Sequence, residues 1–288
     1  MKRLIINADD FGVSHETNAA VCELLENRHI SSASLMANGC AYAEAVEMIR
    51  SRSLDGIGVH LALTRENFDS PAMLTYGSLT GGASISDENG LLWPGRDSFA
   101  KHAADADIIS EIKCQVAAIL SDGIDITHVD NHMYSLMPRM GFRGYRLFFE
   151  AWRQVRFGRR LGMRIARSYY MADGINYVWS GRKLKPYLWW KMLCNGFVGV
   201  DYSFAFPYYA PDHKTLERKR ELLHGFLAAL RDGCTELHIH PAAYSSDIER
   251  QNPYWQNRVH EYELLKELTP ELLMQKYGIE LISYRDLL

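Results

Sequence analysis

Four groups of acidic and histidine side chains follow short apolar runs in this 288-residue chain. They are Asp9 and Asp10; His60; His128, Asp130 and His132; and His238 and His240. Each group falls where a predicted strand ends, and the carboxyl ends of parallel strands converge on one face of an α/β sheet or barrel. We therefore expect side chains that are far apart in the sequence to meet in one pocket.

One aspartate and two histidines make a suitable ligand set for a divalent cation such as Zn²⁺, Mn²⁺ or Mg²⁺. A cation held in this way lowers the pKa of its bound water. Asp9 and Asp10 are adjacent, and Phe11 and Gly12 can curl the end of their strand into a loop. One of the two carboxylates could then bind the metal while the other accepts a proton from water.

Each of these groups, taken alone, also has a simpler interpretation. Adjacent aspartates are common in solvated turns, and a histidine within an apolar run, such as His60, is often a core residue. His240, which precedes Pro241, could be a polar residue at a strand end. Four groups at equivalent places in the predicted topology are harder to explain in this way, so the sequence favours one shared site.

The elements that would position these residues alternate between strand-like and helix-like segments, without an internal repeat. Strands are predicted at 3–8, 32–36, 58–63, 124–129, 235–240 and 280–283. Helices are predicted at 15–28, 41–50, 107–121, 142–161, 215–231, 259–268 and from Pro270. The alternation predicts an α/β fold with a parallel sheet, formed by one domain over residues 1–288. Two loop-rich insertions are expected near 65–105, as a candidate lid, and near 173–197.

The composition excludes several classes of protein. The formal net charge of -3 offers no broad basic surface for nucleic acid or anionic lipid. The apolar run after Met1 is too short for a signal peptide, and no segment approaches the roughly 20 apolar residues that span a bilayer. The five cysteines are scattered without a C-x-x-C pair, and we expect them to be buried. A cytoplasmic protein is expected, and a homodimer is compatible with the sequence.

Four strings carry a resemblance to a known family: NADDFG (7–12), GVHLALT (58–64), THVDNH (127–132) and HIHPA (238–242). They resemble, in the same order, the signatures of the YdjC-like carbohydrate deacetylases, and they span nearly the whole chain. The resemblance implies a (β/α) barrel-like single domain related to polysaccharide deacetylases. It also implies a divalent metal ion, Mg²⁺ or Zn²⁺, and removal of the acetyl group from an N-acetylated sugar, such as a chito-oligosaccharide.

The resemblance also implies roles for individual residues. The implied metal ligands are Asp10, His60 and His132. Asp9 would be the catalytic base, and His240 an acid or oxyanion partner. His128 competes with His132 as a ligand and ranks below it. The chain departs from the family where Met133 and Tyr134 follow His132, because members commonly continue with further histidines, and this departure bears on substrate preference.

Two other functions remain as alternatives. The same cluster could serve a metal-dependent hydrolase of another amide or ester, which a substrate panel would separate from a sugar deacetylase. A non-catalytic protein could instead use this fold to bind a glycan. The presence of Asp9, Asp10, His60, His132 and His240 together counts against that alternative. A chelator-stripped protein that binds no metal would favour it.

Overall fold

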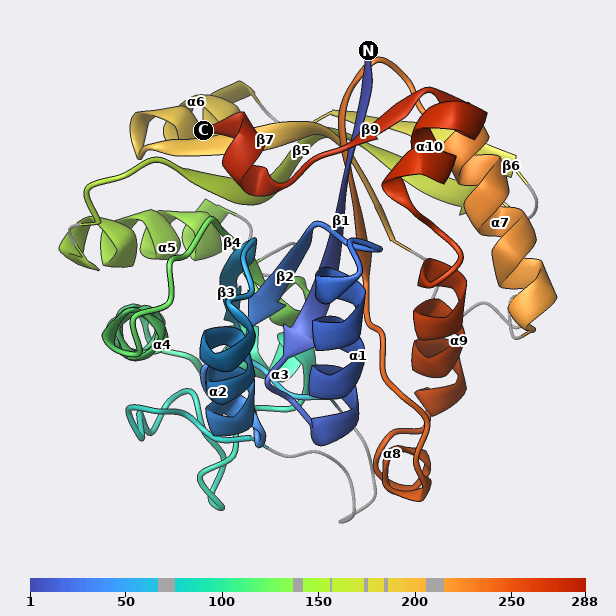
Figure 1. Cartoon of the computed structure of the whole chain (residues 1–288). Coiled ribbons are helices and arrows are strands. Elements are labelled where there is room, and N and C mark those ends of the chain that lie inside the picture. Colours follow the sequence, from blue (N-terminus) through green and yellow to red (C-terminus); the bar gives the residue numbers. More distant parts are fainter. Residues whose placement is uncertain (67–75, 137–141, 156, 174–175, 184–185, 206–214) are drawn as a thin grey trace.

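The computed structural model describes residues 1–66, 76–136, 142–155, 157–173, 176–183, 186–205 and 215–288 (Figure 1). Seven parallel strands among these residues close into a barrel. They are β1 (Lys2–Phe11), β2 (Ser32–Leu35), β3 (Ile57–Leu61), β4 (His128–Asn131), β5 (Leu161–Asp173), β7 (Phe197–Ala205) and β8 (Gly233–Ile239). β1 closes the barrel because it pairs with both β2 and β8. The predicted α/β barrel-like fold is therefore confirmed.

Two more strands extend this sheet. β6 (Asn176–Lys183) pairs antiparallel with β5, and β9 (Ile279–Leu281) pairs parallel with the first residues of β1. Leu4, Ile5 and Ile6 of β1 are fully buried. Barrel strands are covered on both faces, so they appear in the sequence as continuous apolar runs rather than alternating ones.

Helices surround the barrel. They are α1 (His15–Glu26), α2 (Tyr42–Arg52), α3 (Gly95–His102), α4 (Asp105–Ser121), α5 (Phe142–Val155), α6 (Pro186–Cys194), α7 (Leu216–Ala229), α8 (Ser246–Gln251), α9 (Trp255–Leu265) and α10 (Pro270–Tyr277), with short 3₁₀ turns η1 (His132–Tyr134) and η3 (Tyr284–Leu287). α1 packs between α2 and α9, and α4 packs against α5 (Figure 1). The predicted caps are present: the side chain of Ser14 caps α1, and Thr269 caps α10 ahead of Pro270.

Two barrel strands, β5 and β7, occupy residues for which no strand is predicted. The helix predicted over 142–161 ends at Val155, and β5 begins at Leu161. Arg164 and Arg167 interrupt the apolar residues of β5, and charged residues are rare in buried strands unless they are paired. Arg164 is nevertheless buried, since carboxylates surround it. The sequence pattern fails at this position because the compensating charges are far away in the chain.

The two predicted insertions differ in structure. In the described part of 65–105, irregular segments lead into α3, while residues 67–75 lie outside the described residues. Residues 173–197 contain β6 and α6, so regular elements occupy most of a stretch predicted to be loop-rich. The first insertion follows β3 and so leaves the barrel at the carboxyl end of a strand, beside the site described below.

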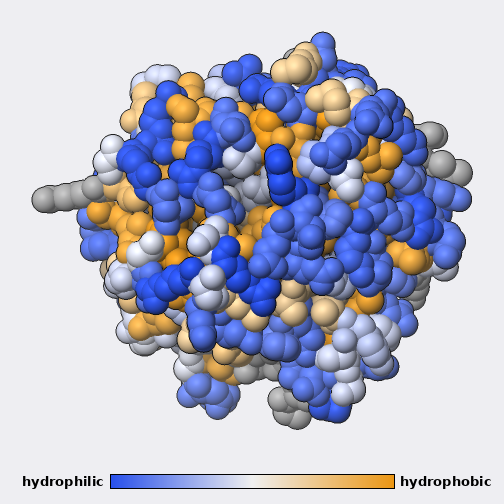
Figure 2. Space-filling model, viewed as in Figure 1, coloured by the Kyte–Doolittle hydropathy of each residue, from blue (hydrophilic) through white to orange (hydrophobic). Residues whose placement is uncertain are grey.

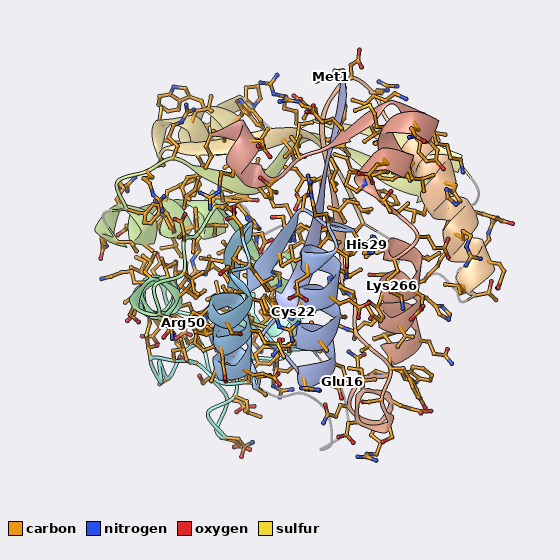
Figure 3. The ribbon with its side chains drawn as sticks, viewed as in Figure 1. Met1, Glu16, Cys22, His29, Arg50 and Lys266 are labelled. Carbon is orange, nitrogen blue, oxygen red and sulfur yellow. The ribbon has the colours of Figure 1, made fainter. Side chains whose placement is uncertain are left out.

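The cysteines only partly match the expectation of burial. Cys22 lies on α1 (Figure 3). Cys22 and Cys234 are buried, Cys114 is half-buried, and Cys40 and Cys194 are exposed. None of the five forms a disulfide.

On the side of α1 and α2, the described residues form no broad apolar face. Hydrophobic residues there are scattered among hydrophilic ones (Figure 2). Among the described residues, no helix combines the length and the apolar character needed to cross a membrane.

Candidate active site

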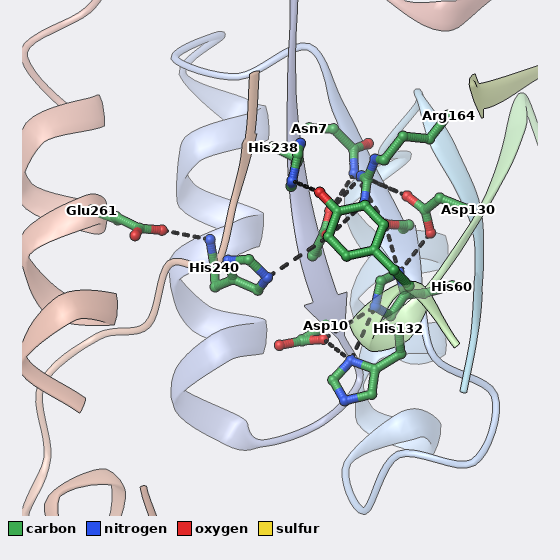
Figure 4. A network of polar contacts seen from close by, with 12 residues as sticks. Asn7, Asp10, His60, Asp130, His132, Arg164, His238, His240 and Glu261 are labelled. Atoms are coloured by element: carbon green, nitrogen blue, oxygen red, sulfur yellow. Dashed lines mark hydrogen bonds and ion pairs between the residues drawn. The ribbon is translucent and has the colours of Figure 1, made fainter. Parts of the chain in front are cut away.

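The carboxyl ends of the barrel strands surround a pocket of about 420 Å³. β1 contributes Asp9 and Asp10, the turn after β4 contributes His132, β5 contributes Arg164, and the segment after β8 contributes His240. This volume falls in the range of small-molecule sites, roughly 300–1,000 Å³. The aspartates and histidines therefore converge as the strand-end argument predicts (Figure 4).

Asp9 and Asp10 have different partners because β1 curls at its end. The pairing of β1 with β2 shifts register between Ala8 and Phe11, and Asp10 has a φ of 64°. Positive φ is uncommon outside glycine, although aspartate adopts it more readily than most residues. A register shift of this kind re-aims a side chain. The curl expected at Phe11 and Gly12 thus begins at Asp10 itself.

Asp10, His60 and His132 form a compact buried group. Oδ1 of Asp10 lies 3.2 Å from Nε2 of His60 and 3.1 Å from Nδ1 of His132, and these two nitrogens are 3.3 Å apart. One ligand atom from each residue lies within 4.8 Å of the others. One carboxylate and two imidazoles are donors that a borderline divalent cation accepts. The donor set therefore fits a divalent metal ion.

A second group of similar geometry, Asp9, His60 and Asp130, fits a metal less well. Arg164 binds Asp9 through both terminal nitrogens, each at 2.6 Å from a carboxylate oxygen, and also lies 2.6 Å from Oδ2 of Asp130. The guanidinium already supplies the positive charge that a metal would supply there. We therefore refer to Asp10, His60 and His132 as the metal-compatible group.

His60 is oriented by a carboxylate behind it. Its Nδ1 lies 2.6 Å from Oδ1 of Asp130, which leaves Nε2 facing Asp10 and His132. Such carboxylate–histidine pairs fix the ring and its tautomer in metal sites. Burial opposes the charged ring, but Asp130 and Asp10 outweigh it and raise the pKa of His60 to about 10.

His132 takes its partners from the insertion that follows β3. Its Nε2 lies 2.8 Å from the hydroxyl of Tyr76 and 3.3 Å from Oε1 of Glu66. Burial opposes the charge of this ring too, but Glu66 and Asp10 raise the pKa of His132 to about 9. Both histidines are therefore protonated at neutral pH in the metal-free protein, and a cation would have to replace those protons.

Asp9 is ionised at every ordinary pH. Burial alone would raise the pKa of its carboxyl, but Arg164, with His60 and His240, holds that pKa far below its usual range. Arg164 also lies 2.8 Å from Glu236 through Nε. Sequence reasoning missed Arg164, because the strand that carries it was not predicted.

His240 lies at the side of the pocket, with 25% of its side chain exposed. Its Nε2 is 3.8 Å from Oδ2 of Asp9, and its backbone N–H donates to Glu261 of α9 at 2.6 Å (Figure 4). Burial lowers the pKa of His240, although Asp10 and Asp9 offset part of this effect. His240 is thus mainly neutral at pH 7 and can accept a proton.

Comparison with known proteins places the chain in a family. A family model described as YdjC-like protein matches residues 3–273. The chain belongs to the YdjC-like family. A relative from Listeria monocytogenes named carbohydrate deacetylase is 26% identical, and the match covers 99% of this chain and 100% of the relative. A Geobacillus stearothermophilus relative of the same name is 28% identical, over 98% of this chain and 96% of its own.

One solved structure has a fold similar to that of this chain. The protein comes from Enterococcus faecalis V583 and is provisionally described as a cellobiose-phosphate cleavage protein. It is similar to this chain with a TM-score of 0.73 and 20% identity, over 99% of this chain and 98% of the other. At this identity the likeness concerns the fold alone.

His128 lies apart from the metal-compatible group of this YdjC-like chain. It is fully buried, its ring stacks on Tyr284 with centroids 4.2 Å apart, and its Nδ1 lies 3.0 Å from the hydroxyl of Thr127. Burial lowers the pKa of His128 to about 4. Among the described residues, His128 joins neither group of candidate ligands, whereas His132 joins the first.

Met133 and Tyr134, where the chain departs from the family pattern, have an unusual backbone. Both have a φ of 52°, a conformation that costs roughly 1–2 kcal/mol per residue outside glycine. The turn brings the Tyr134 hydroxyl to 2.7 Å from Nε2 of His238. Burial and the nearby Arg164 lower the pKa of His238 to about 3, so its ring is neutral at pH 7. Met133, Tyr134 and His238 line the pocket.

Proposed function

We propose that this chain is a metal-dependent hydrolase that removes the acetyl group from an N-acetylated sugar. The observation that carries the proposal is the meeting of Asp10, His60 and His132 beside Asp9 and His240 at one pocket. Relatives that match the full length of this YdjC-like chain are named carbohydrate deacetylase. The groups in the pocket support a metal-dependent hydrolase, and the names of the relatives support a carbohydrate deacetylase.

The proposed ligands are Asp10, His60 and His132, with Zn²⁺ or Mg²⁺ as the cation. When bound, the cation would supply Lewis acidity, polarising the acetyl carbonyl and lowering the pKa of a water molecule. Asp130 would keep the His60 ring in place, and Glu66 and Tyr76 would do the same for His132.

Asp9 and His240 would move the proton. In the proposal, Oδ2 of Asp9 accepts a proton from the attacking water and passes it to Nε2 of His240, 3.8 Å away. His240 then donates the proton to the sugar nitrogen as the carbon–nitrogen bond breaks, which releases acetate and a free amine. The proton that Asp9 takes from water is thus the proton that His240 later donates to the sugar nitrogen.

The test is acetate release by chelator-stripped protein to which Zn²⁺ or Mg²⁺ is returned. Substrates are N-acetylglucosamine oligomers, a non-sugar acetamide and an acetate ester. We expect metal-dependent release from the acetamido sugar at the highest kcat/KM. Hydrolysis of only the non-sugar substrates would contradict the sugar assignment, and metal binding without any hydrolysis would contradict the enzymatic one.

A further inference from the structure

The carboxylate of Asp10 is divided between two sets of partners. Oδ2 lies 2.6 Å from Nη2 of Arg258 on α9, whereas Oδ1 faces His60 and His132. The side chains of Asp10 and Arg258 are 1% and 6% exposed. Burial would raise the pKa of Asp10, but Arg258 and His132 hold that pKa well below its usual range. Each oxygen of this carboxylate therefore has a fixed direction.

Arg258 is itself held by the segment that follows β8. Its carbonyl accepts a hydrogen bond from the backbone N–H of Ala242 at 3.2 Å. One helical turn further along, Glu261 accepts from the N–H of His240 at 2.6 Å and lies 3.6 Å from Nζ of Lys219. Residues three apart lie on the same face of a helix. This face of α9 therefore contacts both Asp10, at the curled end of β1, and the segment of residues 240–242 that follows β8.

We propose that Arg258 is a positioning residue for Asp10: it holds Oδ2 so that Oδ1 alone is presented to His60 and His132. The inference rests on the proposed function, in which Asp10 is a metal ligand. Asp10 needs such a support because its backbone has the uncommon φ of 64° and its side chain is buried. The support is a charge-assisted hydrogen bond from Nη2 of Arg258 to Oδ2, which is stronger than a neutral one and directional.

Two simpler roles make different predictions. If Arg258 only neutralises a buried carboxylate, lysine can replace it, because the charge is kept. If it only stabilises the fold, substitution lowers the melting temperature and leaves the metal affinity of the folded protein unchanged. A positioning role requires a donor at the place of Nη2. The shorter lysine side chain does not bring its ammonium to that place and glutamine carries no charge, so both Arg258→Lys and Arg258→Gln should weaken metal binding.

The experiment is a calorimetric titration of chelator-stripped full-length protein with Zn²⁺ alone. We expect Arg258→Lys and Arg258→Gln each to raise the Kd by roughly 10–100-fold, the effect typical of residues that orient metal ligands. Glu261→Gln is the matched control, since it removes a buried charge from the same face of α9 without touching Asp10. Its Zn²⁺ affinity should equal that of the wild type. Circular dichroism and thermal unfolding establish that each variant is folded.

Wild-type affinity in Arg258→Lys would overturn the inference, as would affinity in both variants equal to or tighter than the wild type. If Arg258→Gln does not fold, Arg258→Lys decides alone. The titration needs no substrate, so its outcome is separate from that of the acetate-release assay. A protein that releases no acetate but shows the expected change in Kd would contradict the proposed function and support the role of Arg258.

Discussion

The two halves of the chain contribute different groups to the pocket. The chain up to His132 supplies the carboxylates and imidazoles of the metal-compatible group, on β1, β3 and the turn after β4. The later chain supplies two buried arginines on β5 and α9. Each aspartate of the adjacent pair in β1 lies 2.6 Å from its own arginine, Asp9 from Arg164 and Asp10 from Arg258.

The two ion pairs differ in how many oxygens they occupy. Arg164 engages both oxygens of Asp9, whereas Arg258 engages only one oxygen of Asp10. The remaining oxygen of Asp10 faces the two histidines. The first half of the chain therefore provides groups that can hold a cation, and the second half determines which carboxylate is available for it. The predictions below test this division.

The largest effect is expected from the ligands of the first half. His132→Ala removes one of three proposed ligands and should reduce Zn²⁺ binding, measured by elemental analysis after dialysis, to a nonspecific level. His128→Gln is the control: it should melt at a lower temperature, because His128 is buried against Tyr284, yet keep its metal. The reverse ranking of the two variants would transfer the ligand role to His128.

The next effect separates the two aspartates. Asp9→Asn keeps the shape of the side chain but cannot accept a proton, so kcat should fall on the order of 10²–10⁴-fold while Zn²⁺ stays bound. Asp10→Asn should instead weaken Zn²⁺ binding, and excess metal should partly restore turnover. If metal rescues Asp9→Asn while Asp10→Asn remains fully loaded and inactive, the two roles are exchanged.

The smallest effect concerns pH. The metal-free pKa values of His60 and His132 are raised to about 10 and about 9, so both rings carry a proton at neutral pH. A cation must displace these protons, so its affinity should rise with pH below about pH 9 and fall as the solution becomes more acidic, with up to about two protons released per ion. Calorimetry in buffers of different ionisation enthalpy counts the protons. Affinity that is constant between about pH 6 and pH 8 would show that the histidines are not ligands.

The sequence alone determined the parts of the molecule that depend on local order. The apolar runs before Asp9, His60 and His238 predict strands that the structure contains. The order of helices and strands predicts an α/β fold with a parallel sheet, and the resemblance to the YdjC-like family implies its closure into a barrel. Because parallel strands bring their carboxyl ends to one face, the sequence also indicated that these polar groups would meet, without any distance being known.

Only the tertiary structure decided which arginines form ion pairs with Asp9 and Asp10. Arg164 and Arg258 look like ordinary surface cations in the sequence. Arg164 also interrupts the apolar residues of β5, so this strand is not predicted. Their partners Asp9 and Asp10 are more than a hundred residues away. A buried charge is stable only beside its counter-charge, and that proximity is a property of the closed barrel. Local sequence patterns predict helices, strands and turns. They do not show which charged residue, far away in the sequence, will form an ion pair with a given aspartate.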